Sequence, residues 1–375
     1  MIKVSENIVY FWRDGHLICD NYINHEQNSL SPIINPIIEF FSDWREKEEV
    51  YELISKNSHF TKEFLDTAIE QLITSNLLVE KDSERHKQEL DLKHWSDWGT
   101  VSKYFHFSTR LLHTDSYLSK SEQYERLKIK KEICPPPPLY KTIPNSEKIW
   151  LPNPQLNGKG DFLEILTTRQ TTRSFENEPI SIEDFSTFLY LSYGIQSCKR
   201  NVGIDQLVFK TSPSAGCRHP IEVYPCVLNV QGIPNGLYHY STQDHSLEII
   251  KINNDMSDIV MDMAAGQNYV DSAAVVMFYT ACLERSMWKY QSPRTYRVIM
   301  MDLGHLSQTS YLTANYLGLG AFFSGHLNDQ LIEEMLDIRP SEEIVLGISG
   351  IGKKSKLAHT LGRDLRFIKE MQDEC

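Results

Sequence analysis

The sequence predicts an α+β protein with two or three domains. Its 375 residues exceed the ~100–200 residues of a usual domain, and an apolar content of 41% is enough for real cores. Residues 182–193 carry apolar side chains at helical spacing, whereas residues 273–279 form a continuous apolar run that is typical of a buried strand. Helix-like and strand-like segments alternate in this way along the C-terminal part of the chain, which indicates a mixed α+β fold.

Residues 1–95 are predicted to form a small separate unit. A β-rich segment at residues 8–12 is followed by a turn at Asp14-Gly15. A helix-like stretch comes next at residues 34–44, and further apolar residues follow at 50–54.

The third helix-like segment of this unit, residues 61–76, has the clearest periodicity. Its apolar residues recur at i, i+3 and i+4, and Thr61 followed by Glu63 suits the start of a helix. Residues 77–79 are predicted to form a short strand. This order of elements resembles a winged-helix module.

The predicted N-terminal unit is acidic. Residues 1–95 hold 10 Lys and Arg against 18 Asp and Glu, a net charge of −8, whereas DNA binding needs basic residues for phosphate contacts. DNA binding is therefore disfavoured. Two interpretations stay open: a module that docks a protein or peptide, and a domain that only packs on the catalytic body.

Residues 96–160 are predicted to be a connector. Its basic run from Arg126 to Lys131 is interpreted as a solvated helix face. Four consecutive prolines, Pro135 to Pro138, exclude a helix or a central strand and impose an extended, stiff polyproline segment.

Residues 161–375 alternate between predicted helices and strands. Residues 223–230 form a strand whose hairpin partner is residues 237–240, because a Gly-Ile-Pro-Asn-Gly turn separates them. A long helix with apolar and small residues on several faces is expected at residues 302–317. The last buried strand is expected at residues 344–348.

Composition and charge disfavour several classes of protein. A net charge of −12 argues against broad nucleic-acid binding, and the seven cysteines, an odd number without a C-x-x-C pair, suit free thiols in a reducing cytosol. The N-terminus lacks the pattern of a signal peptide, and no apolar run reaches the ~18–20 residues of a membrane-spanning helix. His239 and His245 have no partners at metal-ligand spacing, so no metal is expected. We expect a soluble cytoplasmic protein.

Three clusters carry chemistry, although each is weak alone. Arg169, Thr171 and Arg173 offer two guanidinium groups and a hydroxyl that match phosphate oxygens, but such arginines are more often a solvated helix face. Residues 212–216, Ser-Pro-Ser-Ala-Gly, let the backbone approach a flat ring closely, although an ordinary loop has the same composition. Residues 317–325 form a glycine-containing turn after the long helix, and they lack the G-x-G-x-x-G pattern of a Rossmann dinucleotide site.

The order of these clusters along the chain resembles the SagB-type dehydrogenases, a branch of the nitroreductase superfamily. These proteins are the FMN-dependent azoline oxidases of thiazole- and oxazole-modified peptide biosynthesis. The resemblance covers about residues 100–355. The matching segments are Arg169 to Phe175, Pro213 to Gly216, Gly236 to Tyr240, Lys289-Tyr290, Arg294 to Arg297, Asp302 to Gln308 and Gly318 to Gly320.

The resemblance implies how FMN is bound, in a nitroreductase-like fold with a central, mostly antiparallel sheet flanked by helices. Arg169, Thr171 and Arg173 would hold the phosphate and ribityl end, and Lys353 would add a second cation there. The isoalloxazine ring would be lined by Pro213, Ser214 and Gly216, and the backbone at Ser324 and Gly325 would face flavin N5 and O4. Thr171 stands where the family usually has Ser, which keeps the hydroxyl, and Asp302 stands where Glu is usual, which shortens the reach.

Lys289 and Tyr290 are the predicted catalytic pair. Oxidation of an azoline removes a Cα proton, and this needs a base with a near-neutral pKa, whereas free lysine has a pKa of ~10.4. Burial or a nearby cation lowers the pKa of a lysine, and Arg285, Arg294 and Arg297 lie close in sequence. Without the family pattern, a surface lysine beside a packed tyrosine is the favoured interpretation.

The resemblance further implies a homodimer with two FMN sites at its interface. The expected reaction is dehydrogenation of a peptide-borne or carrier-borne heterocycle, with oxygen reoxidising the flavin. A cyclodehydratase is a candidate partner, and the N-terminal module is a candidate site for docking it or a leader peptide. Two alternatives are a nitro or quinone reductase that uses NAD(P)H and a flavin-free docking subunit of a biosynthetic complex.

Overall fold

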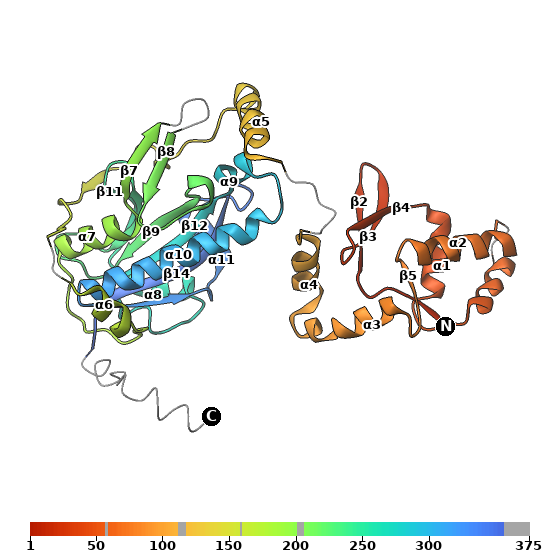
Figure 1. Ribbon diagram of the computed structural model, residues 1–375. Helices are drawn as coiled ribbons and strands as arrows, with labels where there is room; N and C mark the ends of the chain where they lie inside the picture. Colours follow the sequence, from red (N-terminus) through yellow and green to blue (C-terminus); the bar gives the residue numbers. More distant parts are fainter. Residues whose placement is uncertain (57–58, 112–117, 158–159, 201–205, 356–375) are drawn as a thin grey trace. The chain divides into compact units, whose positions relative to one another are not determined.

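The computed structural model describes residues 1–56, 59–111, 118–157, 160–200 and 206–355 (Figure 1). The chain divides into two compact units, residues 1–116 and residues 117–375. Residues 96–160, expected to be a connector, are therefore shared between the two units.

The N-terminal unit combines two small antiparallel sheets with short helices. Strands β1 and β5 pair with each other, and β2, β3 and β4 form a second sheet in that order. Its elements are β1 (Ile2–Val4), β2 (Ile8–Arg13), β3 (His16–Asn21), β4 (Glu26–Leu30), α1 (Asn35–Phe40), α2 (Lys62–Thr74), β5 (Leu78–Glu80), α3 (Glu84–Asp91) and α4 (Gly99–Ser108), with 3-10 helices η1 (Pro32–Ile34), η2 (Lys47–Ser55) and η3 (Lys93–Trp98).

Local signals in the N-terminal sequence produce the expected elements. The β2–β3 hairpin turns at Asp14 and Gly15, which both have positive φ values, 50° and 79°. Helix α2 begins after Thr61, whose Oγ1 accepts a hydrogen bond of 3.1 Å from the N–H of Phe64. The predicted strand at residues 77–79 is present as β5.

The helix expected at residues 34–44 is shorter than predicted, because α1 ends at Phe40. The backbone beyond it bonds to strand β1 instead, with the N–H of Val4 donating to the carbonyl of Phe41 and Ile2 exchanging two bonds with Arg45. This pairing withdraws residues 41–45 from the helix. The described elements do not identify the unit as a winged-helix module, so that resemblance stays a prediction.

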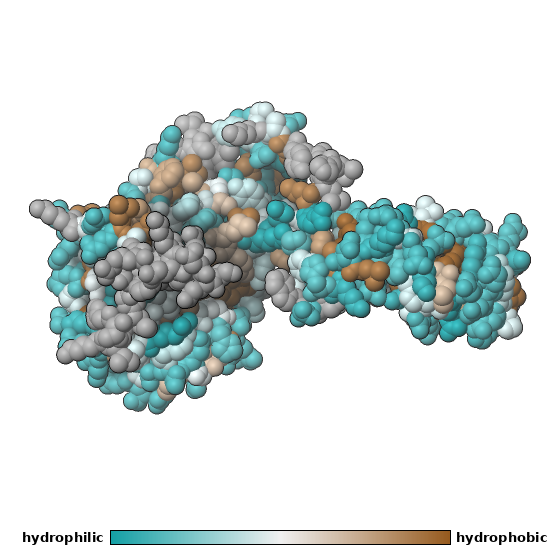
Figure 2. Space-filling view, turned by 60° about the horizontal axis from the view of Figure 1, so that its bottom comes forward, coloured by the Kyte–Doolittle hydropathy of each residue, from teal (hydrophilic) through white to brown (hydrophobic). Residues whose placement is uncertain are grey.

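The surface of the N-terminal unit is largely hydrophilic in the space-filling view, where the unit lies on the right (Figure 2). This agrees with the excess of acidic residues in residues 1–95. Its apolar side chains gather instead in one core that includes Ile37, Leu65 and Leu78.

The C-terminal unit is built on a seven-stranded sheet in the order β13-β14-β12-β9-β10-β11-β6, in which each described pairing is antiparallel. A separate hairpin, β7–β8, stands beside it. The strands are β6 (Lys148–Trp150), β7 (Ile195–Arg200), β8 (Gln206–Lys210), β9 (Ile221–Val227), β10 (Gly236–Ser241), β11 (Ser246–Ile252), β12 (Val275–Cys282), β13 (Leu319–Ser324) and β14 (Glu343–Lys353). The helices are α5 (Lys120–Ile133), α6 (Phe162–Thr168), α7 (Ile182–Tyr193), α8 (Met256–Met263), α9 (Leu283–Lys289), α10 (Thr295–Tyr316) and α11 (Asp329–Leu336), with the 3-10 turn η4 (Ala215–Cys217).

Helices cover both faces of this sheet (Figure 1). Alternate residues of β12 face opposite sides, so that Met277 packs in the core with α7 and α10, whereas Phe278 packs in the core with α8 and α11. Burial of both faces explains why β12 reads as a continuous apolar run. The predicted α+β class and mostly antiparallel sheet are confirmed.

Two elements differ from the sequence prediction. Helix α10 begins at Thr295, seven residues before the predicted start at residue 302, because a turn at Pro293 leads directly into it. The glycine-containing turn expected at residues 317–325 is instead largely strand β13, which pairs with β14.

Candidate functional site

The segment Arg169–Arg173 lies along strand β13. The N–H of Thr172 donates to the carbonyl of Ala321 at 2.8 Å, and Thr171 forms a parallel bridge with the same residue. Glycine at position 320 is required here, since a Cβ atom would lie 2.6 Å from Cγ2 of Thr172. The contact therefore holds the two predicted phosphate-binding arginines at the edge of the sheet.

Arg169 and Arg173 rest on aromatic rings. The guanidinium of Arg169 lies 5.2 Å from the ring centre of Tyr311, and that of Arg173 lies 5.4 Å from the ring centre of Tyr269. Among the residues that the structure describes, neither forms an ion pair with a carboxylate. Thr171 is exposed, and its hydroxyl is 3.2 Å from that of Tyr311. Two such cations beside a hydroxyl suit an anionic group.

Lys353 ends strand β14 close to this segment, because its carbonyl accepts a 2.9 Å hydrogen bond from the N–H of Glu176. Its amine, however, forms an ion pair of 2.8 Å with Glu178. The adjacent Lys354, which the sequence reasoning missed, donates to Asn315 of α10 at 2.9 Å, and burial lowers its pKa. The two lysines therefore face different partners.

A second cluster forms around the loop before β9. Gly216 has a φ of 61°, and a Cβ atom there would lie 2.5 Å from both the Lys289 amine and the Tyr290 hydroxyl. The amine of Lys289 donates to the carbonyl of Gly216 at 3.3 Å. The structure thus brings Gly216 into contact with Lys289 and Tyr290, two predicted site residues about seventy positions later in the chain.

The environment of Lys289 favours its neutral form. The side chain is half-buried at the end of helix α9, and burial, followed by the charge of Arg218, lowers its pKa. Burial raises the pKa of Tyr290. A half-buried lysine with a lowered pKa, held against the loop at Gly216, is a candidate general base.

Arg218, which the sequence reasoning missed, acts on Lys289 in place of the arginines considered there. Arg285 instead forms a 2.5 Å ion pair with Glu222 and donates from Nε to the carbonyl of Pro138 at 3.1 Å. The position of Arg218 two residues after Gly216 is the one feature of the sequence that could have drawn attention to it.

Asp302 anchors the same loop from helix α10. Its carboxylate accepts a hydrogen bond of 2.5 Å from the Ser214 hydroxyl and one of 3.3 Å from the N–H of Ala215. The Ser214 oxygen in turn accepts from the N–H of His219 at 2.9 Å. Burial raises the pKa of Asp302. Pro213, which precedes these residues, is exposed.

Both clusters contact helix α10. Tyr311 meets the arginine segment and Asp302 meets the loop, and nine residues of helix separate them by about 14 Å. An extended ligand with an anionic end fits this arrangement.

Ser324 and Gly325 lie at the end of β13. The Ser324 hydroxyl donates to Gln267 at 2.9 Å and accepts from the N–H of His326, while Gly325 is exposed with open space around it. No hydrogen bond described in the structure joins either residue to Lys289 or Tyr290.

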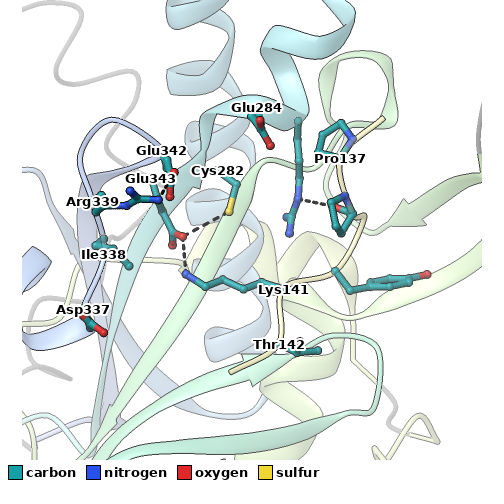
Figure 3. Close-up of a pocket in the computed structure, with 13 residues that line it drawn as sticks. Pro137, Lys141, Thr142, Cys282, Glu284, Asp337, Ile338, Arg339, Glu342 and Glu343 are labelled. Carbon is teal, nitrogen blue, oxygen red and sulfur yellow. Dashed lines mark hydrogen bonds and ion pairs between the residues drawn. The ribbon is translucent and has the colours of Figure 1, made fainter. Parts of the chain in front are cut away.

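The polyproline segment borders a cavity of about 510 Å³ beside helix α9 (Figure 3). Lys141 reaches across it to the buried Glu343 at 2.5 Å. Arg285 lines the cavity and Lys289 does not, so this cavity is separate from the Gly216 contact.

Within the described part of the chain, no group of three His, Cys, Asp or Glu side chains is arranged to hold a metal ion. Among these same residues, no helix is both long and apolar enough to cross a membrane.

Several curated proteins are similar in sequence to this chain. MJ1384 of Methanocaldococcus jannaschii, named as a nitroreductase, is 31% identical over 51% of this chain and 90% of its own length. The trifolitoxin-processing protein TfxB of Rhizobium leguminosarum is 33% identical over 35% of this chain and 36% of its own. The microcin B17-processing protein McbC of Escherichia coli is 27% identical over 37% of this chain and 53% of its own. The chain therefore spans about a third of TfxB and half of McbC.

A solved structure shares the fold, and another gives a weaker match. A structure described as a nitroreductase from Anabaena variabilis matches with a TM-score of 0.52 at 27% identity, covering 68% of this chain and 48% of that one. A structure of the E. coli microcin synthetase McbBCD complex, with truncated pro-MccB17 bound, matches with a TM-score of 0.43 at 18% identity, over 71% of this chain and 97% of that one. Residues 166–353, half of this chain, match the model of the nitroreductase family, and the two clusters on α10 lie within this span. The chain belongs to the nitroreductase family.

Proposed function

We propose that the chain is an FMN-dependent oxidoreductase that dehydrogenates a peptide- or carrier-bound heterocycle, an azoline to an azole, with oxygen as the final oxidant. One observation carries the proposal: a half-buried lysine of lowered pKa, Lys289, is held together with Tyr290 against the loop at Gly216. A nitro or quinone reductase takes its electrons from a nicotinamide and has no need of such a base. A dehydrogenation that removes a Cα proton does need one.

The residues present fit FMN. Arg169 and Arg173 have no carboxylate partner among the described residues and suit the phosphate, with Thr171 beside them. Lys353 is a further proposed contact, although its amine is paired with Glu178. Proteins of the nitroreductase family typically bind FMN.

The flavin ring is proposed to lie against Pro213, Ser214 and Gly216, with the backbone of Ser324 and Gly325 at its polar edge. FMN, when bound, supplies the two-electron acceptor for the hydride that a dehydrogenation releases. The protein supplies the rest: Lys289 takes the Cα proton, Tyr290 assists it, and Asp302 fixes the loop that both contact.

Two relatives support a peptide-borne substrate. TfxB and McbC carry names that describe the processing of trifolitoxin and microcin B17, and McbC belongs to a complex with two other proteins. By analogy, we propose that this chain acts on a modified peptide as a homodimer, together with a partner such as a cyclodehydratase. The acidic N-terminal unit, proposed to be winged-helix-like, is a candidate for docking.

The proposal is tested with the purified protein and a synthetic peptide that carries one thiazoline ring. We expect a yellow protein that releases FMN on denaturation, and a peptide that loses two hydrogen atoms by mass spectrometry. A colourless protein that does not take up FMN would overturn the cofactor assignment. A yellow protein that leaves thiazoline and oxazoline peptides unchanged, also in the presence of its cyclodehydratase, would overturn the substrate assignment.

A reductase is the second candidate, because MJ1384 carries the name nitroreductase and matches over most of its length. Mixing the protein with NAD(P)H in the absence of oxygen separates the two functions. Rapid bleaching of the flavin followed by reduction of a nitro compound would favour the reductase, and slow or absent bleaching would favour the dehydrogenase.

A further inference from the structure

Helix α5 carries the basic run for which the sequence predicts a solvated helix face. Two cations of this run bind a distant part of the chain instead. The Lys130 amine donates to the carbonyl of Trp288 at 2.6 Å, 158 positions later. Arg126 donates to the side-chain oxygen of Gln291 at 3.2 Å, 165 positions later. These two contacts join α5 to the end of α9 and to the turn that follows it (Figure 1).

Lys130 caps helix α9. This helix ends at Lys289, so the carbonyl of Trp288 belongs to its last turn, where carbonyls have no N–H donor within the helix. A lysine that donates to such a carbonyl satisfies it and places a favourable positive charge at the end of the helix. The Trp288 side chain is buried, and its ring centre lies 5.7 Å from the Lys130 amine. The buried ring therefore shields one side of this hydrogen bond from water.

The residue that ends α5 makes a second contact with Trp288. The indole N–H of Trp288 donates to the carbonyl of Cys134 at 2.8 Å, and Cys134 is the C-cap residue of α5. Trp288 thus accepts a hydrogen bond through its backbone and donates one through its side chain, both to the end of α5. The two bonds together fix the position and the orientation of the residue that directly precedes Lys289.

The proposed catalytic pair lies between the points that α5 holds. Lys289 and Tyr290 are the two residues that separate Trp288 from Gln291. Their side-chain ends meet the loop at Gly216, where the Lys289 amine donates to the Gly216 carbonyl at 3.3 Å. Helix α5 therefore holds the backbone before and after the pair, and the loop contacts the reactive ends of the two side chains.

We propose that Lys130 is a positioning residue: by capping α9, it fixes the helix end from which Lys289 and Tyr290 reach the loop at Gly216. Reacting groups must be held close to their productive geometry, and a displacement of about 1 Å can lower a rate by about 10²-fold. Lys130 acts through the backbone of Trp288. This inference rests on the proposed function, in which Lys289 is the base.

The test uses the full-length protein with its bound flavin. Lys130→Met removes the donor and keeps an unbranched side chain, whereas Lys130→Arg retains a charged donor. Lys131→Met is the matched control, because Lys131 is the adjacent residue of the same run and is exposed. Trp288→Phe tests the second contact with α5 independently, since it removes the indole N–H and keeps an aromatic ring. Thermal melting verifies that each variant is folded.

Two measurements are compared. Hydrogen exchange, read by mass spectrometry on a peptide that covers residues 286–292, reports the opening of the end of α9 without any substrate. This peptide includes the N–H of Tyr290, which donates to the carbonyl of Ser286 at 2.9 Å. A peptide from strand β12 is the internal reference. The second measurement is kcat and KM for the thiazoline peptide.

In Lys130→Met we expect exchange at residues 286–292 to become about 10-fold faster, because a charged hydrogen bond at the helix end is lost, while β12 exchanges as before. The kcat should fall by about 10–100-fold and the KM should stay within about 2-fold, as expected for a group that acts on the geometry of the reaction. Lys130→Arg should restore most of both values, and Lys131→Met should match the original protein. Trp288→Phe should change both measurements in the same direction as Lys130→Met.

A folded Lys130→Met protein with an unchanged kcat would overturn the inference, and so would equal effects in Lys131→Met. Faster exchange in β12 as well would show a general loss of stability and would also overturn it. If Lys130→Met does not fold, Trp288→Phe decides by the same criteria. If exchange rises only at residues 286–292 but the original protein leaves the thiazoline peptide unchanged, the capping of α9 by Lys130 is supported and the proposed function fails.

Discussion

The carboxylate of Asp302 and the hydroxyl of Ser214, 88 positions apart in the chain, form a partly buried hydrogen bond of 2.5 Å. Asp302 also accepts from the backbone N–H of Ala215, so one side chain of α10 holds two donors of the loop. The next residue of that loop, Gly216, is the one that touches Lys289 and Tyr290. The position of the loop that contacts the proposed catalytic pair therefore depends on Asp302.

Replacing Asp302 by Asn should destabilise the protein by about 1–3 kcal/mol. The NH2 group of Asn cannot accept a hydrogen bond, so either the Ser214 hydroxyl or the Ala215 N–H loses its acceptor. Chemical denaturation measures this change, and the dehydrogenation rate should fall while FMN stays bound. Asp302→Glu is the matched control, since it retains both acceptor oxygens. Equal stability and equal rates of the two variants would contradict an anchoring role.

Replacing Gly216 by Ala should impair catalysis more than folding. The positive φ costs about 1–3 kcal/mol for any residue with a Cβ atom. The added methyl group also meets the Lys289 amine and the Tyr290 hydroxyl at 2.5 Å, so these groups must move. Gly232→Ala is the matched control, because Gly232 has a φ of 76° and no atoms nearby. Denaturation should show similar losses of stability in both variants, whereas kinetics should show a loss of rate in Gly216→Ala alone. A loss of rate in both variants would point to general destabilisation.

The double change Arg169→Ala with Arg173→Ala should weaken FMN binding by about 100-fold or more, because each charged hydrogen bond to a phosphate contributes roughly 1.5–3 kcal/mol. Fluorescence titration of the apoprotein with FMN measures this affinity. Arg339→Ala, in an exposed pair with Glu342, is the control and should bind FMN normally. A double variant that remains fully yellow after dialysis would show that the phosphate binds elsewhere.

Replacing Lys289 by Ala should retain FMN and lower the dehydrogenation rate by about 10²–10⁴-fold, the usual contribution of a general base. Lys289→Arg should be similarly slow, because its guanidinium does not give up its proton at neutral pH. Lys251→Ala removes an exposed lysine of the same unit and should be neutral. Steady-state kinetics with the thiazoline peptide decides the matter: full activity of Lys289→Ala would exclude Lys289 as the base.

The stability of the protein should fall as the pH rises above about 6.5. His239 is buried between Glu222 and Glu248, at 2.9 Å from each. Burial alone would lower its pKa, but the two carboxylates outweigh burial and raise it above the ordinary value of 6.5. A raised folded-state pKa adds stability that is fully present below the unfolded-state value and is lost as the pH passes the folded-state value.

Thermal melting across this range measures the effect. His239→Gln should be less stable at pH 6 and should show a flatter profile above it, whereas exposed His326→Gln should keep the original slope. Burial would raise the pKa of Glu222, but Arg285 and His239 lower it, so this residue contributes stability that is lost at acidic pH instead. A melting temperature that rises steadily from pH 6 to pH 9 would contradict the assignment.

Local signals predicted much of the fold. The periodicity of residues 182–193 gave the bounds of α7, and Thr61 marked the start of α2. β13 was mistaken for a turn because its strand character comes from pairing with β14, more than twenty residues later. The early start of α10 was missed; its first turn, residues 295–298, is only partly buried, and fully buried side chains begin at Ile299.

The candidate site likewise contains residues that the sequence indicated and residues that it did not. Ordered motifs pointed to Lys289, Tyr290 and Gly216, which the structure brings into contact. Arg285 pairs with Glu222 of β9 because of the register in which β9 pairs with β12, the strand that precedes Arg285. No local sequence pattern encodes that register. Arg218 was overlooked for the same reason, because its burial against α9 is a long-range result of folding.

The contact of Thr172 with Ala321 has a consequence for association between molecules. β13 is the outermost strand on its side of the sheet, and an open outer strand is a template onto which another chain can add. The segment that carries Arg169 and Arg173 occupies the Ala321 carbonyl and so shields this margin. The same stretch of chain therefore covers part of the outer strand and carries the two arginines proposed to bind the FMN phosphate. Loosening it is expected to open the outer strand to pairing with another chain and to displace these arginines.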